Sequence, residues 1–282
     1  MSLKKEFNYS DKNFQFLKKK VKQLAGISLA DSKNEMVYSR VSRLLRQYRF
    51  DNFDAYCDSL KQNNPKMINE FVNAITTNFT SFMREAHHFV FLKEKILPEL
   101  VRLKAQSKKI RIWSAGCSTG EEAFSISFVV SDFFKNHPGW DVKILATDID
   151  SDALNKAELA VYPSESIEDL PHAYQLNPDN YIEYDSSRHS FKIKNNFKQM
   201  VAFKNFNLMS QDAWPMAGPF DVIFCRNVLI YFDRSAQYEV VQKFSKLLSV
   251  QGFLILGHSE SLLGALPEQL KFINGTIYRR SE

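Results

Sequence analysis

The stretch Ile110-Arg-Ile-Trp-Ser-Ala-Gly-Cys-Ser-Thr-Gly-Glu-Glu122 decides the fold class of this chain. Residues 110–114 form a short apolar run typical of a buried strand, and a turn with two glycines follows. From Glu121 to Phe134 the pattern is helical. This order of strand, glycine turn and helix predicts one unit of a parallel α/β sheet.

Similar units follow along the chain. The strand predicted over 142–146 ends at Thr147-Asp148, and a helix is predicted from Ser151 to about Ala157. These strands are apolar on both faces, which indicates a parallel sheet with helices on both sides. We therefore predict a doubly wound α/β domain over 110–282. Later members of the same series are a strand at 221–225, a helix at about 235–248 and a strand at 252–256.

Three segments of this domain have a different pattern. Residues 181–184, 191–194 and 201–206 alternate between apolar and polar side chains. Such alternation is typical of antiparallel strands with one solvated face. The sequence thus predicts a small antiparallel β insertion at about 181–206.

Residues 1–75 are predicted to be a small all-α domain, joined to the rest by a linker over 76–109. An apolar helical stripe is formed by Val37, Val41, Leu44, Leu45 and Tyr48. The whole chain has a net charge of +5, and residues 1–75 hold 14 Lys and Arg against 8 Asp and Glu. This basic character fits a nucleic acid, an anionic membrane surface or an acidic protein partner. Four arginines on the flank and back of the striped helix are either a solvated face or a docking surface: Arg40, Arg43, Arg46 and Arg49.

Composition excludes several classes of protein. The chain has no apolar run of about 18 residues, so we expect no membrane insertion. Its charged first 22 residues do not resemble a secretory signal. The three cysteines, Cys57, Cys117 and Cys225, form no CxxC pair, which favours reduced thiols in the cytoplasm and predicts no metal site.

A nucleoside site is predicted where the first two strands end. In a doubly wound sheet, ligands bind beyond the carboxyl ends of the strands. Gly116 lets the backbone turn, Gly120 lets a ligand approach the next helix, and the Asp148 carboxylate suits a ribose diol. Glu121 and Glu122 at the start of that helix would repel a diphosphate but accept hydrogen bonds from an ammonium group. An adenosine joined to an amino acid fits better than NAD, and a tight turn without any ligand is the remaining alternative.

Several segments, in the same order along the chain, resemble the chemotaxis receptor methyltransferase (CheR) family. They are Thr76-Thr-Asn-Phe-Thr-Ser-Phe-Met-Arg-Glu85 with Ala86-His-His-Phe89, Trp113-Ser-Ala-Gly-Cys-Ser-Thr-Gly-Glu-Glu122, Ala146-Thr-Asp-Ile-Asp150, Phe220-Asp-Val-Ile-Phe-Cys-Arg-Asn-Val-Leu-Ile-Tyr-Phe-Asp233 and Gly257-His-Ser-Glu-Ser261. The resemblance implies a Rossmann-like, S-adenosylmethionine-dependent enzyme that methylates glutamate side chains on chemotaxis receptors and releases S-adenosylhomocysteine.

The resemblance also implies roles for single residues. Arg84 and Tyr231 are the implied catalytic pair, and Arg84 also binds the carboxylate of the cofactor. Asn207 and Leu208 would contact adenine, one by its side chain and one by its backbone or packing. The full set of implied cofactor contacts is Asn78, Thr80, Arg84, Gly116, Glu121, Glu122, Asp148, Asn207, Leu208, Arg226 and Asn227. The motifs do not distinguish which of the two helix-opening glutamates does more, and the histidines are expected to be structural.

The implied partner is the cytoplasmic helical domain of a chemotaxis receptor, and the four arginines at 40–49 would dock on its acidic helices. Some family members also bind a receptor tail peptide through a glycine-bearing loop. No glycine occurs between Gly139 and Gly218, so we expect an enzyme that does not need the tail. A monomer is the default expectation. Rival hypotheses are a methyltransferase acting on a nucleic acid or small molecule, a non-enzymatic binding module, and a nicotinamide dehydrogenase. Because we identify no aromatic and basic stacking platform, no nucleic-acid partner is expected.

Overall fold

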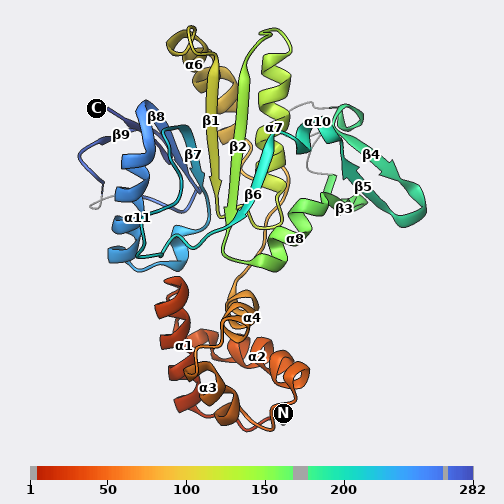
Figure 1. Cartoon of the computed structure of the whole chain (residues 1–282), viewed down its shortest axis with the longest axis vertical. Coiled ribbons are helices and arrows are strands. Elements are labelled where there is room, and N and C mark those ends of the chain that lie inside the picture. The colour runs from red at the N-terminus through yellow and green to blue at the C-terminus, as the bar shows by residue number, and fades with distance from the viewer. Residues whose placement is uncertain (1–4, 168–176, 263–265, 282) are drawn as a thin grey trace.

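The computed structural model describes residues 5–167, 177–262 and 266–281. It consists of an all-α N-terminal domain and a larger Rossmann-like α/β domain (Figure 1). The N-terminal helices are α1 (Asp11–Ala25), η1 (Asp31–Lys33), α2 (Asn34–Tyr48), α3 (Phe53–Lys61) and α4 (Pro65–Ile75). Their apolar faces form one core, which includes Val37, Val41, Leu44 and Leu45 of the predicted stripe.

Local capping explains where these helices begin and end. Asn52 accepts a hydrogen bond from the Ala55 amide, and so starts α3. Asn64 caps α4 with Pro65 in its first turn. Gly26 ends α1 in the left-handed conformation, with φ +72.

Short helices connect the two domains: α5 (His87–Phe91), a π-helical turn η2 (Leu92–Ile96) and α6 (Leu97–Leu103). The α/β domain then follows. Its remaining elements are β1 (Lys109–Ala115), α7 (Glu121–Phe134), β2 (Asp141–Asp148), α8 (Ser151–Leu159), β3 (Val161–Pro163), η3 (Ser164–Ile167), η4 (Pro178–Asn180), β4 (Ile182–Asp185), η5 (Ser186–Arg188), β5 (Ser190–Ile193), α10 (Asn195–Lys198), β6 (Val201–Asn205), β7 (Phe220–Cys225), η6 (Leu229–Tyr231), α11 (Arg234–Leu247), β8 (Leu248–Leu256), β9 (Leu270–Asn274) and β10 (Ile277–Arg280).

The main sheet has seven strands in the order β6-β2-β1-β7-β8-β10-β9. The first five are parallel, while β10 and β9 form an antiparallel end. The doubly wound α/β prediction is therefore confirmed. In Figure 1 the arrowheads of β1 and β2 point toward the N-terminal helices, so the carboxyl ends of the strands face that domain.

The prediction for residues 201–206 is wrong in its pairing. β6 does not join the antiparallel insertion but pairs parallel with β2 and forms the edge of the main sheet. The insertion instead has the order β3-β5-β4, so it begins earlier and includes Val161–Pro163. A strand with one solvated face alternates between apolar and polar side chains, and this alternation is the same whether its single neighbour is parallel or antiparallel.

Candidate active site

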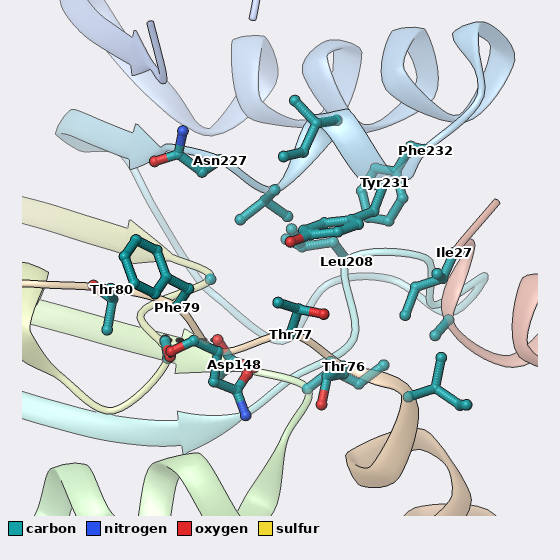
Figure 2. A pocket seen from close by; sticks show the side chains of 18 of the residues that line it. Ile27, Thr76, Thr77, Phe79, Thr80, Asp148, Leu208, Asn227, Tyr231 and Phe232 are labelled. Atoms are coloured by element: carbon teal, nitrogen blue, oxygen red, sulfur yellow. Dashed lines mark hydrogen bonds between the residues drawn. The ribbon is translucent and has the colours of Figure 1, made fainter. Parts of the chain in front are cut away.

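One cavity of 390 Å³ lies between the carboxyl ends of the parallel strands and the N-terminal domain (Figure 2). Most residues with an implied cofactor role line it, although they come from five separate parts of the sequence. These residues are Asn78, Thr80, Arg84, Gly116, Glu122, Asp148, Asn207, Leu208, Arg226, Asn227 and Tyr231. The structure therefore brings together every predicted catalytic or cofactor residue except Glu121.

The glycine turn after β1 has two different structural roles. Gly116 has φ +90, and a Cβ there would lie 2.3 Å from Cγ2 of Val228, so a side chain would displace the loop that follows β7. Gly120 has φ +97, and a Cβ there would lie 2.8 Å from Cβ of Ala157 and 3.0 Å from the Tyr162 hydroxyl. The prediction that Gly120 admits a ligand is therefore wrong. This glycine allows α7, α8 and the insertion to pack closely.

Asp148 ends β2 and lines the cavity beneath the glycine turn. Its Oδ2 accepts a hydrogen bond from the Ser118 amide at 2.7 Å, and its Oδ1 accepts one from the Asp150 amide at 2.9 Å. Burial raises the pKa of this carboxyl above its usual value, although these amides oppose the effect. Each carboxylate oxygen retains capacity for a second hydrogen bond, which a diol can supply.

The two glutamates that open α7 differ in position. Glu122 lines the cavity, and it accepts hydrogen bonds from the Ser114 hydroxyl at 2.7 Å and from Arg226 at 3.1 Å. Glu121 does not line the cavity, and the Thr119 hydroxyl donates to it at 2.7 Å. Burial raises the pKa of both carboxyl groups. Of these two glutamates, only Glu122 lines the cavity, so the geometry favours Glu122, while the implied cofactor contact of Glu121 stays a prediction.

Arg226 is buried between two carboxylates. Its guanidinium lies 3.1 Å from Glu122 and 3.2 Å from Glu85, and it also donates to the Arg84 carbonyl. Glu85 in turn accepts from the Asn227 side chain at 3.2 Å and from the His258 amide at 2.9 Å. Burial alone would raise the pKa of Glu85, but Arg226 and these hydrogen bonds hold it below its usual value. Sequence reasoning gave Glu85 no role, although it stands next to Arg84 in the quoted motif.

The linker after α4 forms one wall of the cavity. Arg84 donates to the Phe79 carbonyl at 2.8 Å, and its guanidinium carbon lies 5.5 Å from the centre of the Phe79 ring. Phe79 itself is 79% exposed at this wall. Asn78 donates to Asp150 at 2.7 Å, and this ties the linker to the end of β2.

Tyr231 lies where the two domains meet. Its ring packs against the core of each domain, and its carbonyl accepts a hydrogen bond from the Ser28 amide at 2.7 Å. Figure 2 shows its hydroxyl pointing into the cavity, and that hydroxyl has no hydrogen-bond partner among residues 5–167, 177–262 and 266–281. Leu208 lines the same side. The Asn207 side chain, by contrast, donates to the Leu24 carbonyl at 2.7 Å, so it also joins the two domains.

The N-terminal domain supplies part of the cavity wall, which sequence reasoning missed. The segment after α1 and the start of α2 contribute Ile27, Leu29, Lys33 and Met36. A Cβ on Gly26 would lie 2.5 Å from Cγ of Met209, so the glycine allows this close contact between the domains. The glycine at the end of α1 was the one available signal.

The four arginines of α2 do not form one uniform surface. Arg43, Arg46 and Arg49 are exposed, and Arg46 lies 3.4 Å from Glu6. Arg40 instead donates to the carbonyls of Ile75 and Thr76 at 2.7 and 2.6 Å. The prediction that Arg40 belongs to a free docking surface needs correction, because its guanidinium caps the last carbonyls of α4. Docking by the other three stays a prediction.

None of the histidines that the structure describes lines the cavity. His88 is fully buried, its Nε2 lies 3.1 Å from the Thr276 hydroxyl, and burial lowers its pKa to about 3. His87 and His258 are also absent from the cavity lining. In the described part of the chain, no three His, Cys, Asp or Glu side chains are arranged to hold a metal ion. Nor is any helix there both long and apolar enough to cross a membrane.

The chain matches known proteins over nearly its whole length. Residues 12–76 match the family "CheR methyltransferase, all-alpha domain", and residues 78–279 match "CheR methyltransferase, SAM binding domain". It is 39% identical to a chemotaxis protein methyltransferase of Borreliella burgdorferi, over 91% of this chain and 89% of that protein. It is 36% identical to the Escherichia coli chemotaxis protein methyltransferase, over 97% of this chain and 92% of that protein. Most residues that line the cavity lie within the S-adenosylmethionine-binding domain match, and the chain belongs to the CheR methyltransferase family.

Proposed function

We propose that this enzyme methylates glutamate side chains in the cytoplasmic helical domain of chemotaxis receptors, producing glutamate methyl esters for sensory adaptation. The observation that supports this best is the composition of the cavity. The carboxylates of Glu122 and Asp148 both line it, the Tyr231 hydroxyl points into it, and none of its described lining residues is a histidine or a cysteine. The relatives named chemotaxis protein methyltransferase support the same acceptor.

The residues present fit S-adenosylmethionine. Its amino acid portion carries an ammonium group, which the buried Glu122 carboxylate can bind, and a carboxylate, which the cavity-lining Arg84 can bind. Asp148 has free lone pairs for a ribose diol. A cavity of 390 Å³ lies within the usual size range of small-molecule sites. Two carboxylates in the same cavity disfavour a diphosphate such as NAD.

The reaction requires alignment rather than a general base. When bound, S-adenosylmethionine supplies an electrophilic methyl group on a sulfonium. That methyl would pass to one oxygen of the acceptor carboxylate, with the cofactor's neutral thioether as the leaving group. Because a glutamate carboxyl is already ionised at neutral pH, no histidine has to remove a proton. Positioning of two reactants in this way lowers a barrier by about 7–11 kcal/mol.

Arg84 and Tyr231 are the residues we assign to this alignment. Arg84 is held by the Phe79 carbonyl and ring, which fixes the direction of its remaining N–H groups. Its charge can orient the carboxylate of the cofactor or of the incoming glutamate. The Tyr231 hydroxyl, with no hydrogen bond to any described residue, is available to donate one to the acceptor oxygen.

Receptor docking is assigned to Arg43, Arg46 and Arg49 on the exposed side of α2. A basic helix complements an acidic receptor helix, and such complementarity mainly accelerates encounter. We further propose that the enzyme works as a cytoplasmic monomer. We also propose that it needs no receptor tail peptide, so truncating a receptor after its helical domain should leave methylation unchanged.

The test is methyl transfer from labelled S-adenosylmethionine to a purified receptor helical fragment, with RNA as the alternative acceptor. We expect label in the fragment that mild alkali releases as methanol, because esters hydrolyse there and N-methyl groups do not. Replacing the acceptor glutamates by alanine should abolish the label. Label in RNA, or alkali-stable label in the fragment, would refute the proposed acceptor.

Calorimetric titration with S-adenosylhomocysteine provides the matched binding experiment. Asp148→Ala should weaken binding, whereas Asp152→Ala, in the first turn of α8 and outside the cavity lining, should not. A binding response to NAD in place of S-adenosylhomocysteine would favour a dehydrogenase and contradict the proposal.

A further inference from the structure

The loop that joins β7 to α11 lines the cavity, and the residues Arg226, Asn227 and Tyr231 belong to it. Much of this loop has no regular backbone pairing of its own: Asn227 is left-handed with φ +58, and only the single turn η6 (Leu229–Tyr231) follows. A loop with so little pairing of its own keeps its conformation through contacts with other segments. The Ser28 amide, which donates to the Tyr231 carbonyl at 2.7 Å, is one of them. A further contact comes from the turn after β8.

The Glu260 carboxylate makes this contact. It is 5% exposed and lies in the turn after β8. Its Oε2 accepts hydrogen bonds from the Asn227 amide at 2.8 Å and the Gly257 amide at 2.6 Å, and its Oε1 accepts one from the Ile230 amide at 3.2 Å. One side chain thus accepts two backbone hydrogen bonds from the loop and one from its own turn.

Gly257 shows how closely this contact is packed. A Cβ there would lie 2.7 Å from Nδ2 of Asn227 and 2.8 Å from Oε2 of Glu260. Such distances are too short for any side chain unless the loop or the carboxylate moves. The turn Gly257–Glu260 and the loop Arg226–Tyr231 are therefore matched to each other in shape as well as in hydrogen bonding.

We propose that Glu260 is a positioning residue for methyl transfer, acting through the loop to hold the Tyr231 hydroxyl and Asn227 in their reactive places. Glu260 is absent from the lining of the main cavity, so it acts without touching either reactant. This inference rests on the proposed function for its activity measurements. Its structural content, that Glu260 fixes the conformation of Tyr231, can be measured without any acceptor.

The activity test compares Glu260→Gln with wild type. An amide keeps the size of the side chain, but its NH₂ group would face backbone amides that need an acceptor. We expect kcat to fall on the order of 100-fold, the effect typical of a displacement of about 1 Å. Rates are expressed per binding-competent site, counted from the stoichiometry of S-adenosylhomocysteine titration. Asn52→Ala is the control, because it removes a helix cap in the N-terminal domain and should lower stability without changing kcat.

A double-mutant cycle with Tyr231→Phe separates positioning from general stability. If Glu260 acts through the tyrosine hydroxyl, Glu260→Gln should cost much less in the Tyr231→Phe background than in wild type. Equal fold-losses in both backgrounds would overturn the proposal, and so would a kcat per site within threefold of wild type. Gly257→Ala, which disturbs the same contact from the other side, should reproduce the loss.

A spectroscopic readout keeps the inference distinct from the proposed acceptor. Fluorotyrosine introduced at position 231 should give one sharp ¹⁹F resonance in the wild-type background, and a broadened or split one with Glu260→Gln. An unchanged single resonance would overturn the inference even if methyl transfer is confirmed. Conversely, a wild-type enzyme that does not methylate receptor fragments would refute the proposed function, while the resonance would still decide the role of Glu260.

Discussion

Replacing Arg226 by methionine tests whether the cation between Glu85 and Glu122 holds the site together. Arg226 is 5% exposed, and it lies 3.2 Å from Glu85 and 3.1 Å from Glu122. Methionine is close in length and fits an apolar environment, so the variant removes the charge while largely filling the space. It leaves two carboxylates that are buried without a cation.

The expected loss is about 3–5 kcal/mol of unfolding free energy at pH 8, the usual cost of removing one partner from a buried ion pair. Little discount for solvent applies, because the side chains of Glu85 and Glu122 are only 16% and 10% exposed. The carboxyl groups limit the loss by taking up protons, since each unit of raised pKa corresponds to about 1.4 kcal/mol.

The loss should depend on pH in a defined direction. In the wild type, burial already raises the pKa of Glu122 despite Arg226, whereas Arg226 helps to hold the pKa of Glu85 low. Without the guanidinium both values rise above the unfolded value of about 4.3. A folded state with raised carboxyl pKa values binds more protons than the unfolded state, so its stability increases as pH falls. The loss is therefore complete above the raised pKa values and disappears toward about pH 4.

Urea unfolding followed by tryptophan fluorescence is the appropriate assay. All three tryptophans, Trp113, Trp140 and Trp214, belong to the α/β domain, so the signal reports on the domain that contains Arg226. Adding Glu85→Gln and Glu122→Gln to Arg226→Met should restore much of the lost stability at pH 8. The control is Arg188→Met, whose side chain is 82% exposed and should have no measurable effect. A loss below about 1 kcal/mol, which is typical of a surface pair, or one independent of pH, would refute the role assigned to Arg226.

Three further predictions concern binding, docking and domain contact. Glu122→Gln should weaken S-adenosylhomocysteine binding about tenfold, as expected for loss of a charged hydrogen bond, whereas Glu121→Gln should change this binding little. Equal effects of the two substitutions in calorimetric titration would contradict the assignment of Glu122. Arg43→Glu together with Arg46→Glu should raise KM for receptor fragments at low salt and leave kcat unchanged, while Arg40→Ala should mainly lower the melting temperature. A KM that does not change with salt concentration would argue against docking through α2. Gly26→Ala should destabilise the chain by about 1–3 kcal/mol, because an alanine there would have a strained backbone and would collide with Met209. An unchanged denaturation midpoint would show that the contact between the domains is not tight.

Much of the architecture was predictable because it depends on local pattern. Apolar strands followed by helices indicate a parallel sheet wherever they occur, and Asp148 lies at the edge where such sheets bind ligands. The motifs around Arg84, Gly116 and Tyr231 identified the family, and the structure brings them to one cavity. The parallel pairing of β6 was not predictable, because an edge strand has the same alternation with either kind of neighbour.

The details of the site depended on contacts between distant residues. Glu121 and Glu122 are adjacent and chemically identical, yet only Glu122 lines the cavity, because side chains one position apart on a helix point about 100° from each other. Arg40 belongs to the same charged row as Arg43, but the end of α4 lies within reach of its guanidinium. Glu260 appeared only as part of a family motif, and its contact with the loop joins residues 33 positions apart.

The amino-acid sequence by itself therefore determined the fold class, the division into a helical and an α/β region, the cofactor and the family to which the chain belongs. These follow from periodicity and from motifs whose chemistry is complete within a few residues. Only the tertiary structure decided which carboxylates face the cavity, which arginines remain exposed and how the N-terminal domain closes the site. The physical reason is that burial and hydrogen bonding are set by whatever packs against a residue, and here those neighbours come from other strands and from the other domain.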